Sequence, residues 1–154
     1  MARSSCCASR SNSSGCGKTP SLIPSAVEEM LRYCGPLELS MARFAREDLE
    51  LHGRAIQANE VVRMDFLAAN RDPEQFPEPD TFDVARTPNK HVAFGHGIHF
   101  CLGAPLARLE ATLAFERMLE LLPRLRLAVP PEQLAWRTSA QVRGVLQLPL
   151  LIQG

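Results

Sequence analysis

The ten residues from Phe94 to Gly103 constrain this chain more than any other stretch, because they place one cysteine on a glycine-rich loop. They read Phe-Gly-His-Gly-Ile-His-Phe-Cys-Leu-Gly, so two glycines precede Cys101 and a third follows it. Glycine reaches positive φ angles and leaves its backbone amide exposed, and the missing side chain of Gly103 leaves room for a flat group beside the sulfur. The loop therefore predicts a binding turn built around a single thiol.

The leucines after this loop recur at spacings of four, three and four residues: Leu102, Leu106, Leu109 and Leu113. This pattern predicts an amphipathic helix from Leu102 to Leu122, ended by Pro123, with Cys101 at its N-terminus. The unpaired amides and the positive end of the helix dipole would favour the thiolate, which is the form that binds metal. Only His96 and His99 lie nearby, which is too few for a structural zinc site, whereas a heme brings four nitrogen ligands of its own.

The loop resembles the heme-binding loop of the cytochrome P-450 family, which is written F-x-x-G-x-x-x-C-x-G. Phe94, Gly97, Cys101 and Gly103 occupy its fixed positions. The resemblance implies that the Cys101 thiolate is the axial ligand of a heme iron, and His99 falls where soluble bacterial members place a donor to a heme propionate. A cysteine taken alone is more often a small buried hydrophobic residue, and the complete loop favours the ligand.

A short helix is predicted from Ile23 to Tyr33, with Ser21 or Ser25 available as its N-cap. Glu29 and Arg32 lie three residues apart on one side of it, and an exposed pair of this kind contributes only about 0.3 kcal/mol. The segment resembles the E-x-x-R helix of the cytochrome P-450 family. That resemblance implies a buried pair beneath the heme loop, because buried charges need partners.

Two more arginines take their expected roles from the resemblance. The proline-rich segment 76–86 is similar to the family's meander before the heme loop, so Arg86 is expected to complete a structural cluster with Glu29 and Arg32. Arg43 opens a stretch similar to the family's strand in which the leading arginine reaches a heme propionate. For Arg43 the alternative is an ordinary strand arginine.

The remaining segments predict short elements. Glycine and proline interrupt residues 37–62 in the rhythm of small antiparallel strands, residues 64–70 suit a buried helix, and residues 125–129 and 145–152 suit strands. The expected fold is mainly α with small antiparallel β segments. It corresponds to the C-terminal portion of the cytochrome P-450 fold and is incomplete.

Composition separates residues 1–20 from residues 21–154. The first are rich in Ser, Cys, Arg and Gly and predict a disordered, low-complexity tail, and the second resemble the C-terminal part of a cytochrome P-450 domain. The five cysteines show no disulfide-framework spacing, which favours a reducing cytoplasm. A metal or redox module is the alternative for the cysteines outside the loop, although their spacing matches no common zinc pattern: Cys6, Cys7, Cys16 and Cys34.

Charge and hydropathy narrow the partners. The 17 basic residues balance the 17 acidic residues, which argues against binding to nucleic acid or an anionic membrane. No apolar run approaches the roughly 18 residues of a membrane span. We therefore expect neither a nucleic-acid partner nor a membrane partner.

The resemblance implies a heme-thiolate monooxygenase that hydroxylates a C–H bond of a small organic substrate. The reaction uses O2 and two electrons from a ferredoxin or flavodoxin-type donor. No catalytic residue is assigned, because the family's distal proton-delivering helix has no counterpart here, and neither do most substrate-recognition segments. A truncated chain that cannot turn over substrate alone is therefore expected. The alternative is a catalytically inactive remnant or partner-binding module that binds heme weakly or not at all.

Overall fold

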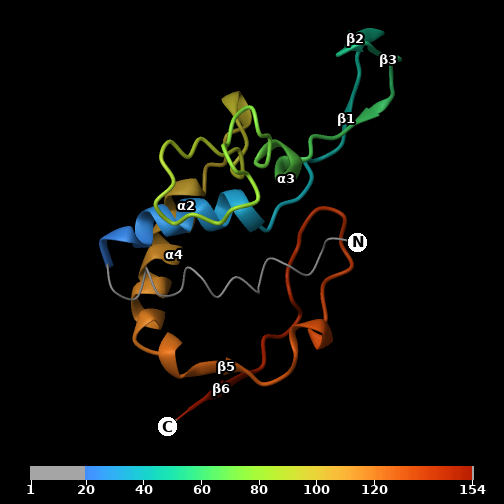
Figure 1. The fold of residues 1–154 in the computed structure, drawn as a ribbon. Coiled ribbons are helices and arrows are strands. Elements are labelled where there is room, and N and C mark those ends of the chain that lie inside the picture. Colours follow the sequence, from blue (N-terminus) through green and yellow to red (C-terminus); the bar gives the residue numbers. More distant parts are fainter. Residues whose placement is uncertain (1–19, 154) are drawn as a thin grey trace.

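The computed structural model of the chain describes residues 20–153 (Figure 1). The helices are α2 (Ile23–Cys34), α3 (Phe66–Ala69) and α4 (Ala104–Leu119). Short 3-10 turns lie at Pro20–Leu22, Gly97–His99, Leu122–Arg124 and Pro131–Gln133. Residues 1–19, which make up nearly all of the predicted tail, lie outside the described residues, and so do Cys6, Cys7 and Cys16.

The strands are short and pair in antiparallel twos. They are β1 (Arg43–Phe44), β2 (Leu49–Leu51), β3 (Arg54–Ile56), β4 (Val61–Val62), β5 (Leu125–Leu127) and β6 (Leu150–Ile152). β1 pairs with β4, β2 with β3, and β5 with β6. Helices combined with small antiparallel sheets confirm the predicted fold class.

The β2–β3 hairpin extends away from the helices (Figure 1). Its two-residue turn consists of His52 and Gly53, whose φ angles are 49° and 76°. Two positive φ angles in succession are the requirement of a type I′ turn, whose twist matches that of the paired strands. The turn residues therefore fix the register of the hairpin, in which Leu51 lies opposite Arg54.

The core is small and is built around α2, which contacts both α3 and α4. On α2 the apolar side chains of Ile23, Ala26 and Val27 are buried. Two charged side chains of the same helix, Glu29 and Arg32, are 0% exposed. The centre of this fold is therefore partly ionic, and its charges must be balanced inside the chain.

Helix α2 begins differently from the prediction. Its N-cap is Leu22 and no side chain caps it, so neither predicted serine serves as a cap. The Ser25 hydroxyl lies 2.6 Å from the Val84 carbonyl oxygen, which it can reach as a donor. A proline in the first turn has no amide to satisfy, and Pro24 therefore lets α2 continue directly from the preceding 3-10 turn.

The buried helix predicted over residues 64–70 is a single turn, α3, with no buried residues. Asp65 caps it by accepting a 2.9 Å hydrogen bond from the Ala68 amide. The buried residue of this segment is the polar Asn70, which is 1% exposed. The prediction was wrong about burial because Asn70 is held by hydrogen bonds to other segments, which the apolar pattern does not register.

Helix α4 begins at Ala104, later than predicted, because Pro105 suits the first turn of a helix. The four periodic leucines are exposed, from 99% for Leu102 to 52% for Leu113. Ala104 is 0% exposed, and half-buried Ala107 and Ala111 follow it at helical spacing. The predicted packing face is therefore wrong within residues 20–153, because α4 packs through its alanines.

The C-terminal strands are shorter than predicted. β5 and β6 together cover only part of the segments 125–129 and 145–152, and Val145 pairs instead with Trp136 in an isolated bridge. No helix within residues 20–153 is long and apolar enough to cross a membrane.

Candidate functional site

A cavity of about 620 Å³ opens beside Cys101. The residues predicted to bind heme that line it are Arg43, Phe94, His99 and Cys101. Most of the other walls are apolar side chains: Leu31, Pro36, Leu37, Met41, Met64, Phe66, Ala69, Val92 and Ala93. The fold thus brings a strand arginine to the same space as the cysteine loop, 58 residues further along the chain.

The Cys101 loop, residues 94–103, is closed by its own backbone. The Cys101 amide donates a 2.9 Å hydrogen bond to the Phe94 carbonyl, and the Phe100 amide donates one of 3.0 Å to the Gly97 carbonyl. Gly95 and Gly97 have φ angles of 76° and 66°, where residues with a Cβ are strained. Two of the glycines that mark the loop in the sequence therefore have a backbone reason to be there.

The thiol of Cys101 is free and exposed. Because the N-cap of α4 is Gly103, Cys101 lies two residues before the cap and not at the helix N-terminus as predicted. Its carbonyl accepts a 3.2 Å hydrogen bond from the Ala104 amide, which links the loop to the helix. A Cβ built on Gly103 would lie 3.8 Å from the Cys101 sulfur, an ordinary contact that would narrow its surroundings.

The donor-bearing side chains at this cavity include Arg43 from β1 and His99 from the 3-10 turn. Within residues 20–153 neither has a hydrogen-bond or ion-pair partner. A guanidinium and an imidazole beside apolar walls suit a ligand that is largely apolar and carries acidic groups at its edge. With the thiol as a single axial ligand, this set of side chains fits a heme.

Gly97 and Gly103 do not line the cavity, although both belong to the Cys101 loop. Their place is in the backbone on either side of the cysteine. Within residues 20–153, no group of three or more His, Cys, Asp or Glu side chains could hold a metal ion. A bare ion would thus lack ligands here, whereas a heme needs only one.

A buried charge cluster consists of Glu29, Arg32 and Arg86. Arg32 donates two hydrogen bonds of 2.8 Å to the two carboxylate oxygens of Glu29. The Arg86 Nε atom lies 3.3 Å from the same carboxylate. Both side chains of the Glu29–Arg32 pair are 0% exposed, so this bidentate pair is shielded from water.

The Glu29 carboxylate also accepts hydrogen bonds from the Asp83 amide at 2.9 Å and from the Asn89 side chain at 3.1 Å. Burial raises the pKa of Glu29, but the hydrogen bonds from Arg32 and the Asp83 amide outweigh it. The pKa therefore lies below its ordinary value of 4.5. Glu29 is ionised at neutral pH despite its burial.

The arginines of the cluster hold the irregular segment 77–83 through its carbonyl groups. Arg32 donates to the Pro79 carbonyl at 2.9 Å and to the Thr81 carbonyl at 3.1 Å. Arg86 donates to the Pro77 carbonyl at 2.8 Å. A segment without regular secondary structure thereby has its backbone acceptors satisfied by side chains.

Sequence reasoning missed Asn70, which connects the buried charge cluster to the cavity wall. Its carbonyl accepts a 2.9 Å hydrogen bond from Arg32, and its side-chain oxygen accepts one of 2.7 Å from the Val92 amide. Val92 lines the cavity. Asn70 lies two residues before an Asp-Pro pair, and this local pattern gives no signal of its role, because its partners lie 38 and 22 residues away.

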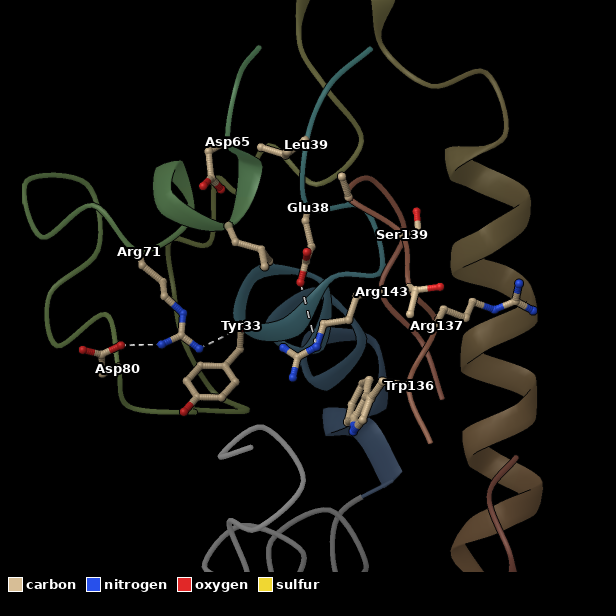
Figure 2. Close-up of a pocket in the computed structure, with 13 residues that line it drawn as sticks. Tyr33, Glu38, Leu39, Asp65, Arg71, Asp80, Trp136, Arg137, Ser139 and Arg143 are labelled. Carbon is tan, nitrogen blue, oxygen red and sulfur yellow. Dashed lines mark hydrogen bonds and ion pairs between the residues drawn. The ribbon is translucent and has the colours of Figure 1, made fainter. Parts of the chain in front are cut away.

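A second cavity, of about 1150 Å³, lies between α2, α3 and the C-terminal segment (Figure 2). Two of its arginines have acidic partners: Arg71 is paired with Asp80, and the Arg143 Nε atom lies 3.9 Å from the Glu38 carboxylate. Arg143 also stacks 4.6 Å from the centre of the Trp136 ring. None of the residues predicted to bind heme lines this cavity, so the functional site is the cavity beside Cys101.

The family model described as Cytochrome P450 matches residues 20–153. This chain belongs to the cytochrome P450 family. It is 52% identical over 134 residues to mycinamicin IV hydroxylase/epoxidase of Micromonospora griseorubida, covering 86% of this chain and 34% of that protein. It is 49% identical over 129 residues to the cytochrome P450 monooxygenase PikC of Streptomyces venezuelae, covering 84% of this chain and 31% of that protein.

Solved structures agree. The tirandamycin C-bound P450 monooxygenase TamI superposes with a TM-score of 0.86 at 48% identity, covering 92% of this chain and 36% of that chain. The P450 enzyme PksS of Bacillus subtilis gives a TM-score of 0.86 at 42% identity, covering 90% and 36%. The family membership inferred from the loop is thus confirmed, and the chain spans about a third of the length of the curated relatives it matches.

Proposed function

We propose that this chain carries the heme-thiolate site of a cytochrome P450 monooxygenase, with Cys101 as the axial ligand of the heme iron. The observation that carries the proposal is the cavity that unites Cys101, Phe94, Arg43 and His99 within apolar walls. A bound heme would supply the activation of O2 that inserts an oxygen atom into a C–H bond.

The cavity residues would bind and orient the cofactor. Arg43 and His99 would donate hydrogen bonds to its two propionates, for which the planar guanidinium of Arg43 offers two parallel N–H groups. Phe94 would form part of the apolar wall. Gly97 would let the Cys101 loop turn, and Gly103 would keep the space beside the sulfur open.

The role that we propose for the buried charge cluster is structural. Glu29, Arg32 and Arg86 fix the segment 77–83 and, through Asn70, hold Val92 at the cavity wall. Rigid support of this kind keeps a binding site in one geometry without contributing a reacting group. We assign no catalytic residue to this chain.

The relatives support the substrate class that we propose, a small organic molecule. One relative is named for hydroxylation of 6-deoxyerythronolide B and another for 25-hydroxylation of vitamin D(3). Because these two relatives are named for different substrates, we propose only hydroxylation of a C–H bond in a small organic molecule. The two electrons would come from a ferredoxin or flavodoxin-type donor, and the cytoplasm would keep the Cys101 thiol reduced.

For the domain organisation, we propose that residues 21–154 form the heme-thiolate part of a P450 domain and that residues 1–20 are a separate tail. The family match from residue 20 to residue 153 supports this division. The relatives are about three times as long as the matched segment, so activity is proposed for the complete enzyme.

The test is the absorption spectrum of the ferrous carbonyl form after heme is added to the purified chain. A thiolate ligand shifts the Soret band strongly to the red, and we expect this band in the parent chain and in Cys34→Ser. Cys101→Ser should lack it, because serine supplies no thiolate. Cys34 is the matched control, since it is a cysteine of the described residues that does not line this cavity. A red-shifted band that persists in Cys101→Ser would overturn the proposal.

A further inference from the structure

Glu28, the neighbour of Glu29 on α2, contacts both flanks of the Cys101 loop. Arg108 of α4 donates hydrogen bonds to both its carboxylate oxygens, from Nε at 2.6 Å and from Nη2 at 2.9 Å. The Nε2 atom of His91 lies 3.0 Å from one of these oxygens. His91 precedes the loop and Arg108 follows it, so a single carboxylate joins the two ends.

The hydrogen-bond network assigns the tautomer of His91. Its Nδ1 atom accepts a 3.2 Å hydrogen bond from the Ala93 amide, so the proton lies on Nε2 and is donated to Glu28. The His91 side chain is only 2% exposed. Burial lowers the pKa of His91 more than Glu28 raises it, so the ring is neutral at physiological pH.

Arg108 also contacts the loop directly. Its guanidinium carbon lies 4.7 Å from the centre of the Phe94 ring, within the range of a cation–π interaction. The Phe94 carbonyl accepts the hydrogen bond of the Cys101 amide. Arg108 therefore contacts both the Glu28 carboxylate on α2 and Phe94, the residue whose carbonyl holds the Cys101 amide.

We propose that Glu28, His91 and Arg108, here named the Glu28 clamp, are positioning residues that hold the Cys101 loop in its ligand-binding geometry. The inference rests on the proposed function. An exposed ion pair would contribute little, but this one is bidentate, is shared with a buried histidine and is stacked on an aromatic ring of the loop. The clamp acts on the loop from both ends, whereas the buried charge cluster holds the segment 77–83.

The first test is hydrogen exchange of the heme-free chain, compared between Glu28→Gln and Glu38→Gln. The glutamine at position 28 keeps the shape of the side chain but turns an NH2 group towards partners that are themselves donors. Glu38 is a matched control, because its side chain is similarly exposed, 25% against 28%, and is paired with Arg143 away from the loop. We expect exchange of residues 94–103 to rise about tenfold or more in Glu28→Gln only.

Strands β5 and β6 serve as the internal reference for this measurement. A rise confined to residues 94–103 supports the clamp. An equal rise in the reference strands would show a general loss of stability and would overturn it, as would similar exchange of the loop in Glu28→Gln and Glu38→Gln. Arg108→Lys provides a second variant, since it keeps the charge but cannot form the bidentate contact, and it should show the same local rise.

The second test is the ferrous carbonyl spectrum after heme addition. Glu28→Gln and Arg108→Lys should retain heme but lose part of the red-shifted thiolate band, and Glu38→Gln should keep it. A full thiolate band in both clamp variants would overturn the proposal. Absence of the band from the parent chain would defeat the proposed function, and the exchange of residues 94–103 in the heme-free chain would still decide the clamp.

Discussion

The buried charge cluster and the cavity beside Cys101 both contain arginine, but the arginines differ in their hydrogen-bond partners. In the cluster, Arg32 has acceptors on Glu29, Asn70, Pro79 and Thr81, and it is shielded from water. In the cavity, Arg43 has no partner within residues 20–153. The contrast separates charges that stabilise the fold from charges that await a ligand, and each prediction below tests one side of it.

The largest expected effect is on the buried charge cluster. Glu29→Ala removes the carboxylate that balances Arg32 and Arg86, and leaving buried charges unpaired typically costs about 3 to 5 kcal/mol. We expect a loss of this size in the free energy of unfolding, or failure to fold, measured by denaturant titration. Glu120→Ala is the control, because Glu120 is exposed at the end of α4. Equal stabilities of the two variants would contradict the role of the cluster.

The second prediction concerns acidification. Because the pKa of His91 in the folded chain lies below its ordinary value of 6.5, the unfolded chain binds this proton at higher pH than the folded chain does. Stability should therefore begin to fall as the pH drops below about 6.5, by at most about 1.4 kcal/mol per pH unit. Burial raises the pKa values of Glu28 and Glu29, but their hydrogen-bonded partners lower them by more, so both pKa values lie below the ordinary value. Stability from these carboxylates is lost only below their ordinary value of 4.5.

The measurement is the free energy of unfolding as a function of pH for the parent chain, His91→Asn and His52→Asn. His91→Asn should lose the dependence that begins near 6.5, since asparagine does not titrate. His52 is the control because it is exposed in the β2–β3 turn, at a positive φ angle that asparagine tolerates. A pH dependence that survives in His91→Asn would assign it to another group.

The third prediction compares two glycines of the Cys101 loop. Gly97 has a φ angle of 66°, so Gly97→Ala should cost about 1 kcal/mol of backbone strain. Gly103 has an ordinary φ angle of −81°, and a Cβ there meets only the Cys101 sulfur at 3.8 Å. Gly103→Ala should therefore change the free energy of unfolding, measured by thermal denaturation, by less than about 0.5 kcal/mol. A larger loss in Gly103→Ala than in Gly97→Ala would show that the loop is held differently.

The smallest expected effect on stability is at the cavity beside Cys101. Arg43→Ala should change the free energy of unfolding by less than about 0.5 kcal/mol, because no described contact is lost. Its heme affinity should nevertheless fall about tenfold or more, since a charge-assisted hydrogen bond to a propionate would be missing. Arg46→Ala is the control, as Arg46 is exposed and does not line the cavity. Heme titration that ranks the two variants equally would remove Arg43 from the site.

The sequence predicted elements better than it predicted faces. Local chemistry is enough for the β2–β3 hairpin, where His52 and Gly53 supply the turn, and for the Cys101 loop, where Gly95 and Gly97 supply the positive φ angles. The leucine period identified a helix at α4 but assigned its packing to the wrong side. The alanines on the more buried side of α4 are less hydrophobic than the leucines, so a pattern that ranks hydrophobicity cannot select them.

The sequence pattern also did not predict contacts between residues that lie far apart in the chain. The resemblance singled out Glu29, Arg32 and Arg86, and the structure places all three around one carboxylate. Nothing in the local pattern distinguishes Glu28 from an exposed helix glutamate, because Arg108 lies 80 residues away and His91 lies 63 away. The packing of α4 on α2 brings Arg108 to Glu28, and His91 reaches the same carboxylate from the segment before the Cys101 loop.

The adjacent glutamates of α2 have a consequence for how this chain can vary. Successive residues of a helix point about 100° apart, so Glu28 and Glu29 direct their carboxylates to two different sets of partners from one turn. An inserted or deleted residue earlier in α2 would rotate both carboxylates away at once. A change in the length of α2 before these residues is therefore expected to be disruptive, whereas the protruding β2–β3 turn can accept extra residues without moving either set.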